Sequence, residues 1–184
     1  MILSKPNALV YVYRNGLIVA GKHITQARLS FGPELVTNLE VLNPDKLIER
    51  CRQFFTDNGL RHRRVVVVLD HSLVFEKKIE LDQSGKPDVL AEAFVAAMPF
   101  EEGLRACLQV QTDKQLQLLA TNARIYQSVA QALHACGVAK VVAITPVNAF
   151  VLPKEQRKVS SLVEVFLKDT ASSKEVDFTS VQPL

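Results

Sequence analysis

Apolar runs alternate with polar turns along the first third of the chain. Residues 8–13 and 17–20 are apolar, β-branched or aromatic, and Arg14-Asn15-Gly16 separates them. Asn-Gly between two such runs predicts a hairpin, because both residues tolerate the positive φ of a type I′ turn. A third strand is predicted over 23–31, where Gly32-Pro33 ends it. The chain is therefore expected to begin with three successive strands.

Apolar residues recur at helical spacing in three later segments. Asn43 is a suitable N-cap for the first helix, and Thr121 or Asn122 can cap the third. Glycine follows the first and third helices, and Pro99 limits the second. The helices are predicted over about 44–58, 88–98 and 122–136.

The remaining apolar segments have the lengths and patterns of strands. Residues 65–69 form a continuous apolar run too short for a helix, which predicts a central strand buried on both faces. Residues 73–81 alternate between apolar and polar and are expected to form its neighbour. The same alternation over 104–111 and 115–120 predicts a half-exposed antiparallel pair. Residues 141–144 are predicted as another buried strand.

The composition is that of a globular domain. Of the 184 residues, 48% are hydrophobic and 22% are charged, so a sizeable core can form and disorder is not indicated. The 22 basic and 19 acidic residues leave a net charge of +3, and the basic residues are scattered except at Arg61-His62-Arg63-Arg64. Affinity for a phosphate backbone grows with clustered contacts, so nucleic-acid binding is not expected.

The cysteines and the N-terminus indicate the cellular compartment. Cys51, Cys107 and Cys136 lie far apart within apolar or helical patterns, so we interpret them as reduced core thiols. The N-terminus lacks the residue order of a signal peptide, and no run approaches the roughly 20 apolar residues that cross a bilayer. The chain is therefore expected to be soluble and cytoplasmic, without direct membrane insertion.

The sequence contains no motif for catalysis or cofactor binding. Glycine-rich phosphate loops, HExxH and GxSxG are all absent. Asp70-His71-Ser72 follows a buried strand, but consecutive residues cannot converge as a hydrolytic triad, so we interpret them as a turn. His23, His62 and His134 have no acidic or cysteine partners at ligand spacing, so only the fold could bring them to a metal. No catalytic, metal-binding or cofactor-binding residue is predicted.

Two stretches are candidate partner surfaces. The basic stretch 61–64 lies between a helix C-terminus and a strand, where cations meet the helix dipole favourably; an anion or acidic-partner site is the alternative. The apolar stretch 31–42 fits neither helix nor strand, and such loops close a core edge or line a groove for a peptide. The candidate partner-binding residues are Phe31, Leu35, Val36, Leu39, Arg61, Arg63 and Arg64.

The order of elements carries a family resemblance. The strand 64–69 is followed by the segment 72–81, by a helix ending in Met98-Pro99-Phe100-Glu101-Glu102, by two strands, and by a helix containing 133–138 before a final strand. In this order the chain resembles the N-terminal part of the PilM-type pilus assembly proteins, which have an actin-like fold and are related to the cytoplasmic region of GspL-type secretion proteins. The resemblance covers roughly residues 40–150.

The resemblance implies an α/β (α+β) fold of mixed sheets with flanking helices. Its core is expected to be a partial actin-like (ribonuclease H-like) lobe with an inserted α+β subdomain. Residues 1–152 are predicted as the truncated actin-like domain, with 1–82 and 139–152 in the first lobe and 83–138 in the subdomain. A short helix is predicted over 147–152, and the polar residues 153–184 are predicted as a linker or tail.

The first hairpin departs from the family pattern. In actin-like ATPases the first hairpin carries an aspartate and a glycine that contact magnesium and phosphate. Residues 10–16 here read VYVYRNG and contain no acid. The resemblance thus implies a non-catalytic, cofactor-free scaffold or docking module at the inner face of the cell membrane, in a type IV pilus or type II secretion platform. Its partner would be a protein, such as the cytoplasmic segment of a membrane component. The alternative is an ATP-binding actin-like protein whose second lobe is missing from this chain.

Overall fold

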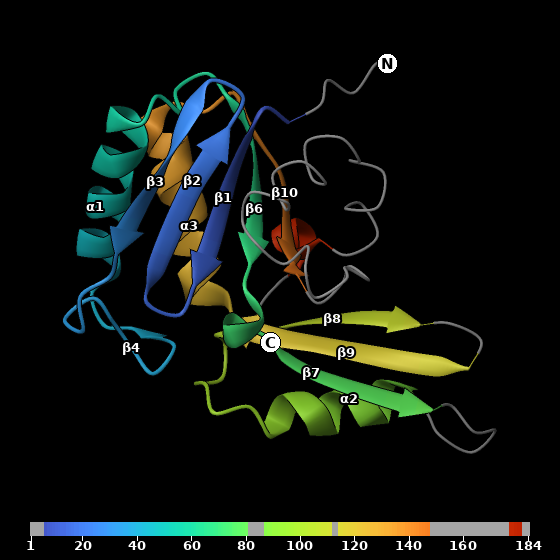
Figure 1. Cartoon of the computed structure of the whole chain (residues 1–184). Coiled ribbons are helices and arrows are strands. Elements are labelled where there is room, and N and C mark those ends of the chain that lie inside the picture. The colour runs from blue at the N-terminus through green and yellow to red at the C-terminus, as the bar shows by residue number, and fades with distance from the viewer. Residues whose placement is uncertain (1–5, 81–86, 112–113, 148–176, 182–184) are drawn as a thin grey trace.

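The computed structural model describes residues 6–80, 87–111, 114–147 and 177–181, and within them a five-stranded sheet forms the main layer (Figure 1). The strand order is β10-β6-β1-β2-β3; β1, β2 and β3 are antiparallel, and β6 and β10 run parallel to β1. The predicted strands are confirmed, and β6 is an interior strand whose residues 65–69 are buried. The strands are β1 (Ala8–Tyr13), β2 (Gly16–Gly21), β3 (Ile24–Ser30), β6 (Arg64–Leu69) and β10 (Lys140–Pro146).

Two helices, α1 (Pro44–Asp57) and α3 (Ala123–Cys136), pack on one face of this sheet. The Asn43 side chain accepts a hydrogen bond from Lys46 N at 3.1 Å and thereby caps α1, as predicted. Asn122 caps α3 in the same way. Gly137 ends α3 in the left-handed conformation, at φ 85°.

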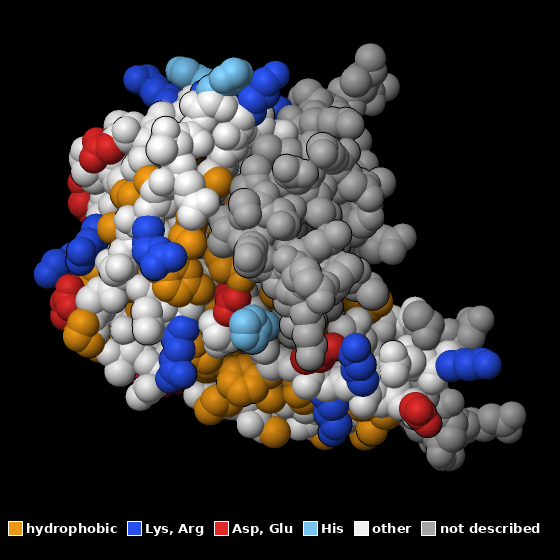
Figure 2. Space-filling view, viewed as in Figure 1, with side chains coloured by type: hydrophobic (Ala, Val, Ile, Leu, Met, Phe, Trp, Pro, Cys, Tyr) orange, Lys and Arg blue, Asp and Glu red, His pale blue; other side chains and the backbone are white. Residues whose placement is uncertain are grey.

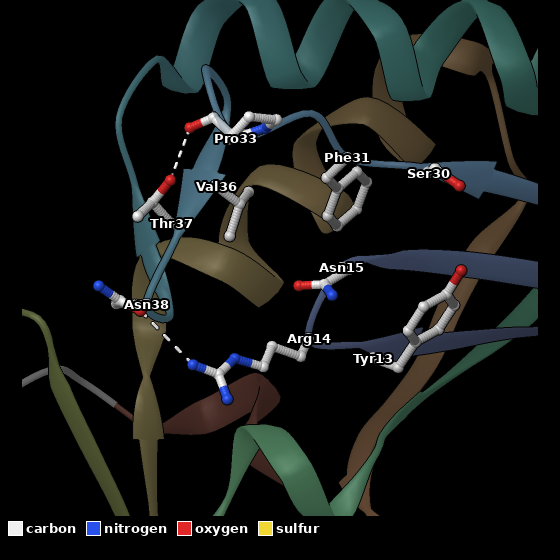
Figure 3. Close-up of a pocket in the computed structure, with 9 residues that line it drawn as sticks. All are labelled: Tyr13, Arg14, Asn15, Ser30, Phe31, Pro33, Val36, Thr37 and Asn38. Carbon is white, nitrogen blue, oxygen red and sulfur yellow. Dashed lines mark hydrogen bonds between the residues drawn. The ribbon is translucent and has the colours of Figure 1, made fainter.

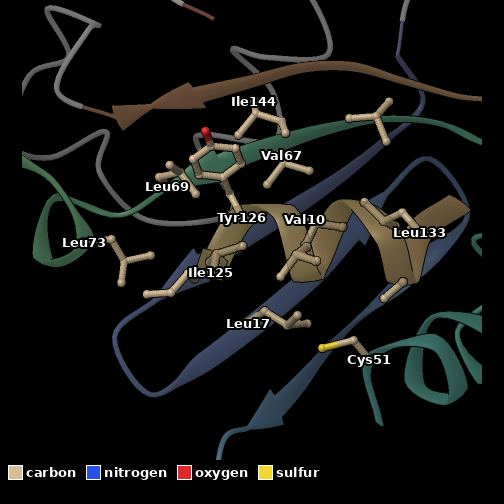
Figure 4. Close-up of a cluster of buried hydrophobic side chains, with 14 of the residues drawn as sticks. Val10, Leu17, Cys51, Val67, Leu69, Leu73, Ile125, Tyr126, Leu133 and Ile144 are labelled. Atoms are coloured by element: carbon tan, nitrogen blue, oxygen red, sulfur yellow. The ribbon is translucent and has the colours of Figure 1, made fainter. Parts of the chain in front are cut away.

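The main hydrophobic core lies between the sheet and these two helices (Figure 4). Val10, Leu17 and Val67 reach it from the strands, and Cys51 and Leu133 reach it from α1 and α3. Cys51 is fully buried, and burial raises the pKa of its thiol to about 12. It is therefore a protonated core thiol, in agreement with the prediction from the sequence.

A smaller antiparallel sheet of order β7-β9-β8 lies beside the first, with α2 on one face (Figure 1). Its own core includes Phe75 and Phe100, whose ring centroids lie 5.6 Å apart. The short hairpin of β4 (Val36–Thr37) and β5 (Glu40–Val41) joins the two units, because Leu39 at its tip packs against both cores. The elements of the smaller unit are β7 (Phe75–Glu80), α2 (Pro87–Ala96), β8 (Arg105–Gln111) and β9 (Gln115–Asn122).

The strand predicted over 73–81 does not lie next to the central strand, so this prediction is wrong. β7 pairs antiparallel with β9 in the smaller sheet, and β6 lies between β1 and β10. The physical reason is the intervening turn. Asp70 caps a single 3-10 turn, η1 (His71–Leu73), before the chain enters the second sheet as β7.

The first hairpin turns at other residues than predicted. Tyr13 pairs with Gly16, so Arg14 and Asn15 form the two-residue turn. Neither Asn15 nor Gly16 has a positive φ, and the predicted type I′ turn at these residues is therefore wrong. Gly16 is required for space instead, because a Cβ there would lie 2.3 Å from the Leu29 carbonyl oxygen of β3.

The predicted fold class, mixed sheets with flanking helices, is confirmed. Three antiparallel strands followed by two parallel ones give the order of a ribonuclease H-like lobe. We propose subdomain boundaries of about 74–122 in place of 83–138, because β7 belongs to the smaller sheet and α3 packs in the main core. The short helix predicted over 147–152 and most of the predicted tail fall outside the described residues.

Candidate functional site

A pocket of about 650 Å³ opens beside the turn of the first hairpin (Figure 3). The β1–β2 turn forms one wall, and the segment from the end of β3 through β4 forms the other. Because β2 pairs with both β1 and β3, the sheet fixes the turn next to the end of β3. The lining residues are Tyr13, Arg14, Asn15, Ser30, Phe31, Pro33, Val36, Thr37 and Asn38.

The pocket combines one positive charge with polar and apolar surface. Arg14 is the charged residue among the nine that line it, and none of them is acidic. Arg14 Nη2 lies 3.5 Å from Asn38 Oδ1, which connects the hairpin turn to the β4–β5 loop. A second cation lies beside the pocket, since Arg28 Cζ is 5.8 Å from the centroid of the Tyr13 ring. This surface suits an acidic ligand and supplies no carboxylate for Mg²⁺.

The predicted apolar partner residues belong largely to the core. Phe31 and Val36 are each 7% exposed and also line the pocket, so they close the core edge and form an apolar wall of the pocket. Leu35 is fully buried. Leu39 is half-buried at φ 68°, and its carbonyl oxygen accepts a hydrogen bond from Asn122 Nδ2 at 3.1 Å. Partner binding by this stretch stays a prediction, with Phe31 and Val36 at the pocket.

The predicted basic residues Arg61, Arg63 and Arg64 lie at the other end of the main sheet. They lie where β6 begins, whereas the pocket lies where the parallel strand β1 ends. Arg63 Nη1 lies 3.5 Å from the Lys22 carbonyl oxygen, beside the β2–β3 turn, and Lys, Arg and His side chains gather at this end (Figure 2). The structure therefore does not bring the basic and apolar candidates into one site, and the basic surface stays a separate prediction.

A polar cluster lies at the ends of β1 and β6. The Tyr11 hydroxyl donates a hydrogen bond to Asp70 Oδ2, and Asp70 Oδ1 accepts one from Ser72 N at 2.8 Å. His71 Nδ1 lies 3.1 Å from the same Oδ2, and its side chain is 69% exposed. The turn predicted at 70–72 is confirmed by these contacts. No pattern in the sequence indicates Tyr11 as a partner of Asp70, because the two residues lie 59 positions apart.

The surroundings keep Asp70 ionised and Tyr11 protonated. Burial alone would raise the pKa of Asp70, but hydrogen bonds from Ser72 and Tyr11 outweigh burial and lower this pKa below its ordinary value. Burial raises the pKa of Tyr11 well above its ordinary value, and the bond to Asp70 raises it further. In a hydrolytic triad the histidine lies between the acid and the nucleophile, whereas here Asp70 lies between His71 and Ser72. The cluster therefore has the geometry of a structural network.

The described residues contain no cluster that could hold a metal ion, counting groups of three or more His, Cys, Asp or Glu side chains. The fold thus leaves His23, His62 and His134 without such a group in the described part of the chain. None of the helices in those ranges has the length and apolar character that a membrane-spanning helix requires.

Several solved structures are similar to this chain. No protein-family model and no curated protein matches it. The PilM-PilN type IV pilus biogenesis complex matches at 18% identity over 74% of this chain and 46% of the other, with a TM-score of 0.48. The cytoplasmic domain of EpsL, an inner membrane component of the type II secretion system of Vibrio cholerae, matches at 12% identity over 80% and 60%, with a TM-score of 0.52. A Bacteroides thetaiotaomicron protein with an actin-like ATPase fold and unknown function matches at 8% identity over 74% and 52%, with a TM-score of 0.41.

This chain spans between 46% and 60% of the length of these three chains. At these identities the similarity concerns the fold. The resemblance in fold to the cytoplasmic region of GspL-type secretion proteins, predicted from the sequence, is confirmed at this level: the chain shares the fold of the part of the EpsL cytoplasmic domain that it matches.

Proposed function

We propose that this chain is a non-catalytic docking module of an inner-membrane assembly platform of the type IV pilus or type II secretion kind. The first hairpin is the observation that carries the proposal. The actin-like ATPases that the chain resembles carry an acid for magnesium in this hairpin, whereas residues 8–21 here contain none, with Tyr11 in β1 and Arg14 in the turn. Neither side chain supplies the hard anionic oxygen that Mg²⁺ prefers. The EpsL domain, whose fold the chain shares, is a component of such a platform.

The hydrogen bonds of Asp70 support a role without catalysis. The Asp70 carboxylate lies against β1, and both of its oxygens already accept hydrogen bonds, from Tyr11 and from Ser72. Rotating this carboxylate toward a metal would leave the buried Tyr11 hydroxyl without a partner, which costs roughly 1–3 kcal/mol. Asp70 is therefore better suited to hold β1 and η1 together than to bind Mg²⁺.

The pocket beside the first hairpin is the proposed docking surface. A partner segment with an acidic residue would pair with Arg14, and an apolar residue would contact Phe31 and Val36. β3 is one of the two edge strands of the described sheet, and Ser30 at its end lines the pocket. An extended segment can therefore add its backbone to β3 while its side chains enter the pocket. The proposed partner is therefore an acidic, extended cytoplasmic segment of a membrane protein.

Charge reversal at the pocket is expected to weaken partner binding about tenfold, which corresponds to about 1.4 kcal/mol. The measurement is fluorescence anisotropy with a labelled peptide from the acidic cytoplasmic segment of a pilus or secretion membrane protein. Arg14→Glu is the test, and Arg63→Glu at the far end of the sheet is the matched control, expected to leave the dissociation constant unchanged. Loss of binding in the Arg63→Glu variant alone would show that the docking surface is at the basic end of the main sheet instead.

Mg-ATP is expected to leave the melting temperature unchanged within about one degree, because no acidic group of the first hairpin can hold the metal. A ligand at about 100 times its dissociation constant stabilises a protein by roughly 2.7 kcal/mol. For a chain of 184 residues this corresponds to a rise of about 5–10 °C. Differential scanning fluorimetry with Mg-ATP, and with ATP in EDTA as the control, distinguishes the two results. A rise of that size requiring magnesium would favour an ATP-binding protein.

A further inference from the structure

The described C-terminal residues Asp177–Val181 pack against the body of the fold. They include a single 3-10 turn, η5 (Phe178–Ser180), which lies beside β10 (Figure 1, red). Phe178 is 1% exposed and belongs to the main hydrophobic core. Its ring centroid lies 5.6 Å from that of Tyr126 on α3. An aromatic side chain near the end of the chain is therefore as buried as the centre of the main core.

A polar contact accompanies this anchor. Asp177 Oδ1 accepts a hydrogen bond from Ile144 N of β10 at 2.8 Å and another from Thr179 N at 3.0 Å. β10 is an edge strand of the sheet formed by the described residues. The backbone amides of an edge strand are open to pairing with other chains unless something covers them. The hydrogen bond to the Asp177 carboxylate pairs the Ile144 amide, which is then not open to another chain.

The order of this segment must come from its contacts with the body. A single 3-10 turn of three residues is too short to be stable alone, because the entropy lost in forming the first turn exceeds the stabilisation from its hydrogen bond. What holds it is a buried aromatic side chain and a carboxylate on an edge amide. Folded domains use both kinds of contact, an aromatic anchor and pairing with the backbone of an edge strand, when they bind short peptides.

We propose that the seam between α3 and β10 is a docking site for a short acid–aromatic motif, which the chain fills with its own Asp177-Phe178-Thr179 and which the same segment of a second copy can fill in exchange. Within one chain the segment is covalently attached to the domain that carries the site, so the chain's own copy is favoured over a copy in trans. The segment of a second copy binds when the contacts of the chain's own segment are weakened. This inference does not depend on the proposed function of the pocket.

The test uses the full chain and a fluorescent peptide of residues 174–184. The Phe178→Ala chain, whose own segment has lost its anchor, is expected to bind the peptide saturably and at least about tenfold more tightly than the unsubstituted chain. The peptide carrying Phe178→Ala is expected not to bind. Phe54→Ala, which truncates a half-buried phenylalanine of α1, is the matched control for general destabilisation and should bind no better than the unsubstituted chain. Equal binding by the unsubstituted and Phe178→Ala chains would overturn the proposal.

A second measurement covers the case in which Phe178→Ala folds poorly. Asp177→Ala keeps the aromatic anchor and removes the acceptor of the Ile144 amide. Hydrogen exchange followed by NMR should show this amide losing at least about tenfold in protection, while the amides of β6 keep theirs. Unchanged protection at Ile144 would show that Asp177 does not dock on the edge of β10 in solution, and the proposal would fail.

Discussion

Replacing Asp70 with alanine is expected to lower the free energy of unfolding by about 3 kcal/mol. The carboxylate accepts hydrogen bonds from Tyr11 and from the backbone of Ser72, and both hold the end of β1 against the turn η1. Hydrogen bonds to a charged group contribute roughly 1.5–3 kcal/mol, and removal of this group also leaves the buried Tyr11 hydroxyl unpaired. Urea unfolding followed by circular dichroism gives the change in free energy.

Two further variants separate the contributions to this effect. Tyr11→Phe removes the donor and leaves the carboxylate with its bond from Ser72, so a smaller loss of about 1–2 kcal/mol is expected. The double variant should lose less than the sum of the two single losses, because each substitution removes the same bond. Additive losses would contradict a direct contribution of the Tyr11–Asp70 bond to stability.

The same carboxylate makes stability depend on pH. Its pKa in the folded chain lies below the ordinary value, so the folded state binds fewer protons than the unfolded state in the acidic range. The stabilising contribution is complete above the ordinary aspartate pKa of about 4 and is lost as the pH falls through the lower folded value. Asp70→Ala should therefore flatten the decline in stability below about pH 4 relative to the unsubstituted chain.

Local signals in the sequence were sufficient for the helices and for the central strands. Asn43 and Asn122 cap their helices through their own side chains, and Gly137 adopts the left-handed conformation that stops α3. The apolar run of β6 likewise fits its place between β1 and β10. These features depend on contacts within a few residues or on burial of a whole run, which periodicity and capping residues report directly.

The antiparallel pairing of β8 with β9 was predicted from the sequence, but the partner of the strand 73–81 and the partners of polar side chains could not be predicted in this way. The alternation over 73–81 indicates a strand with one buried face, but it contains no information on which sheet that face completes. The single turn η1 separates β6 from β7, and after this turn β7 pairs with β9 in the smaller sheet. The Tyr11–Asp70 bond joins residues 59 positions apart, and Phe178 reaches the main core from near the end of the chain. Such pairings arise only when the chain has folded.

Because the fold has two cores, replacing a buried phenylalanine with alanine is expected to raise hydrogen exchange in different strands, depending on which core contains it. Phe55 is fully buried between α1 and the main sheet, so Phe55→Ala should cost about 3–5 kcal/mol of unfolding free energy. Hydrogen exchange should rise in both sheets, because β9 continues directly into α3 and the smaller sheet is anchored through that helix. Exchange measured by mass spectrometry on peptides from β1, β6 and β9 reports this.

Phe94 of α2 is the matched position in the smaller core, and its side chain is 8% exposed. Phe94→Ala removes the same atoms, but α2 packs on the smaller sheet and contributes nothing to the main core. Exchange should therefore rise in β7, β8 and β9 while β1 and β6 keep their protection, since local opening of the 74–122 unit leaves the main sheet paired. Equal loss of protection in β1 and β6 would show that the two cores unfold as one unit, and the boundaries proposed for the subdomain would then have no energetic meaning.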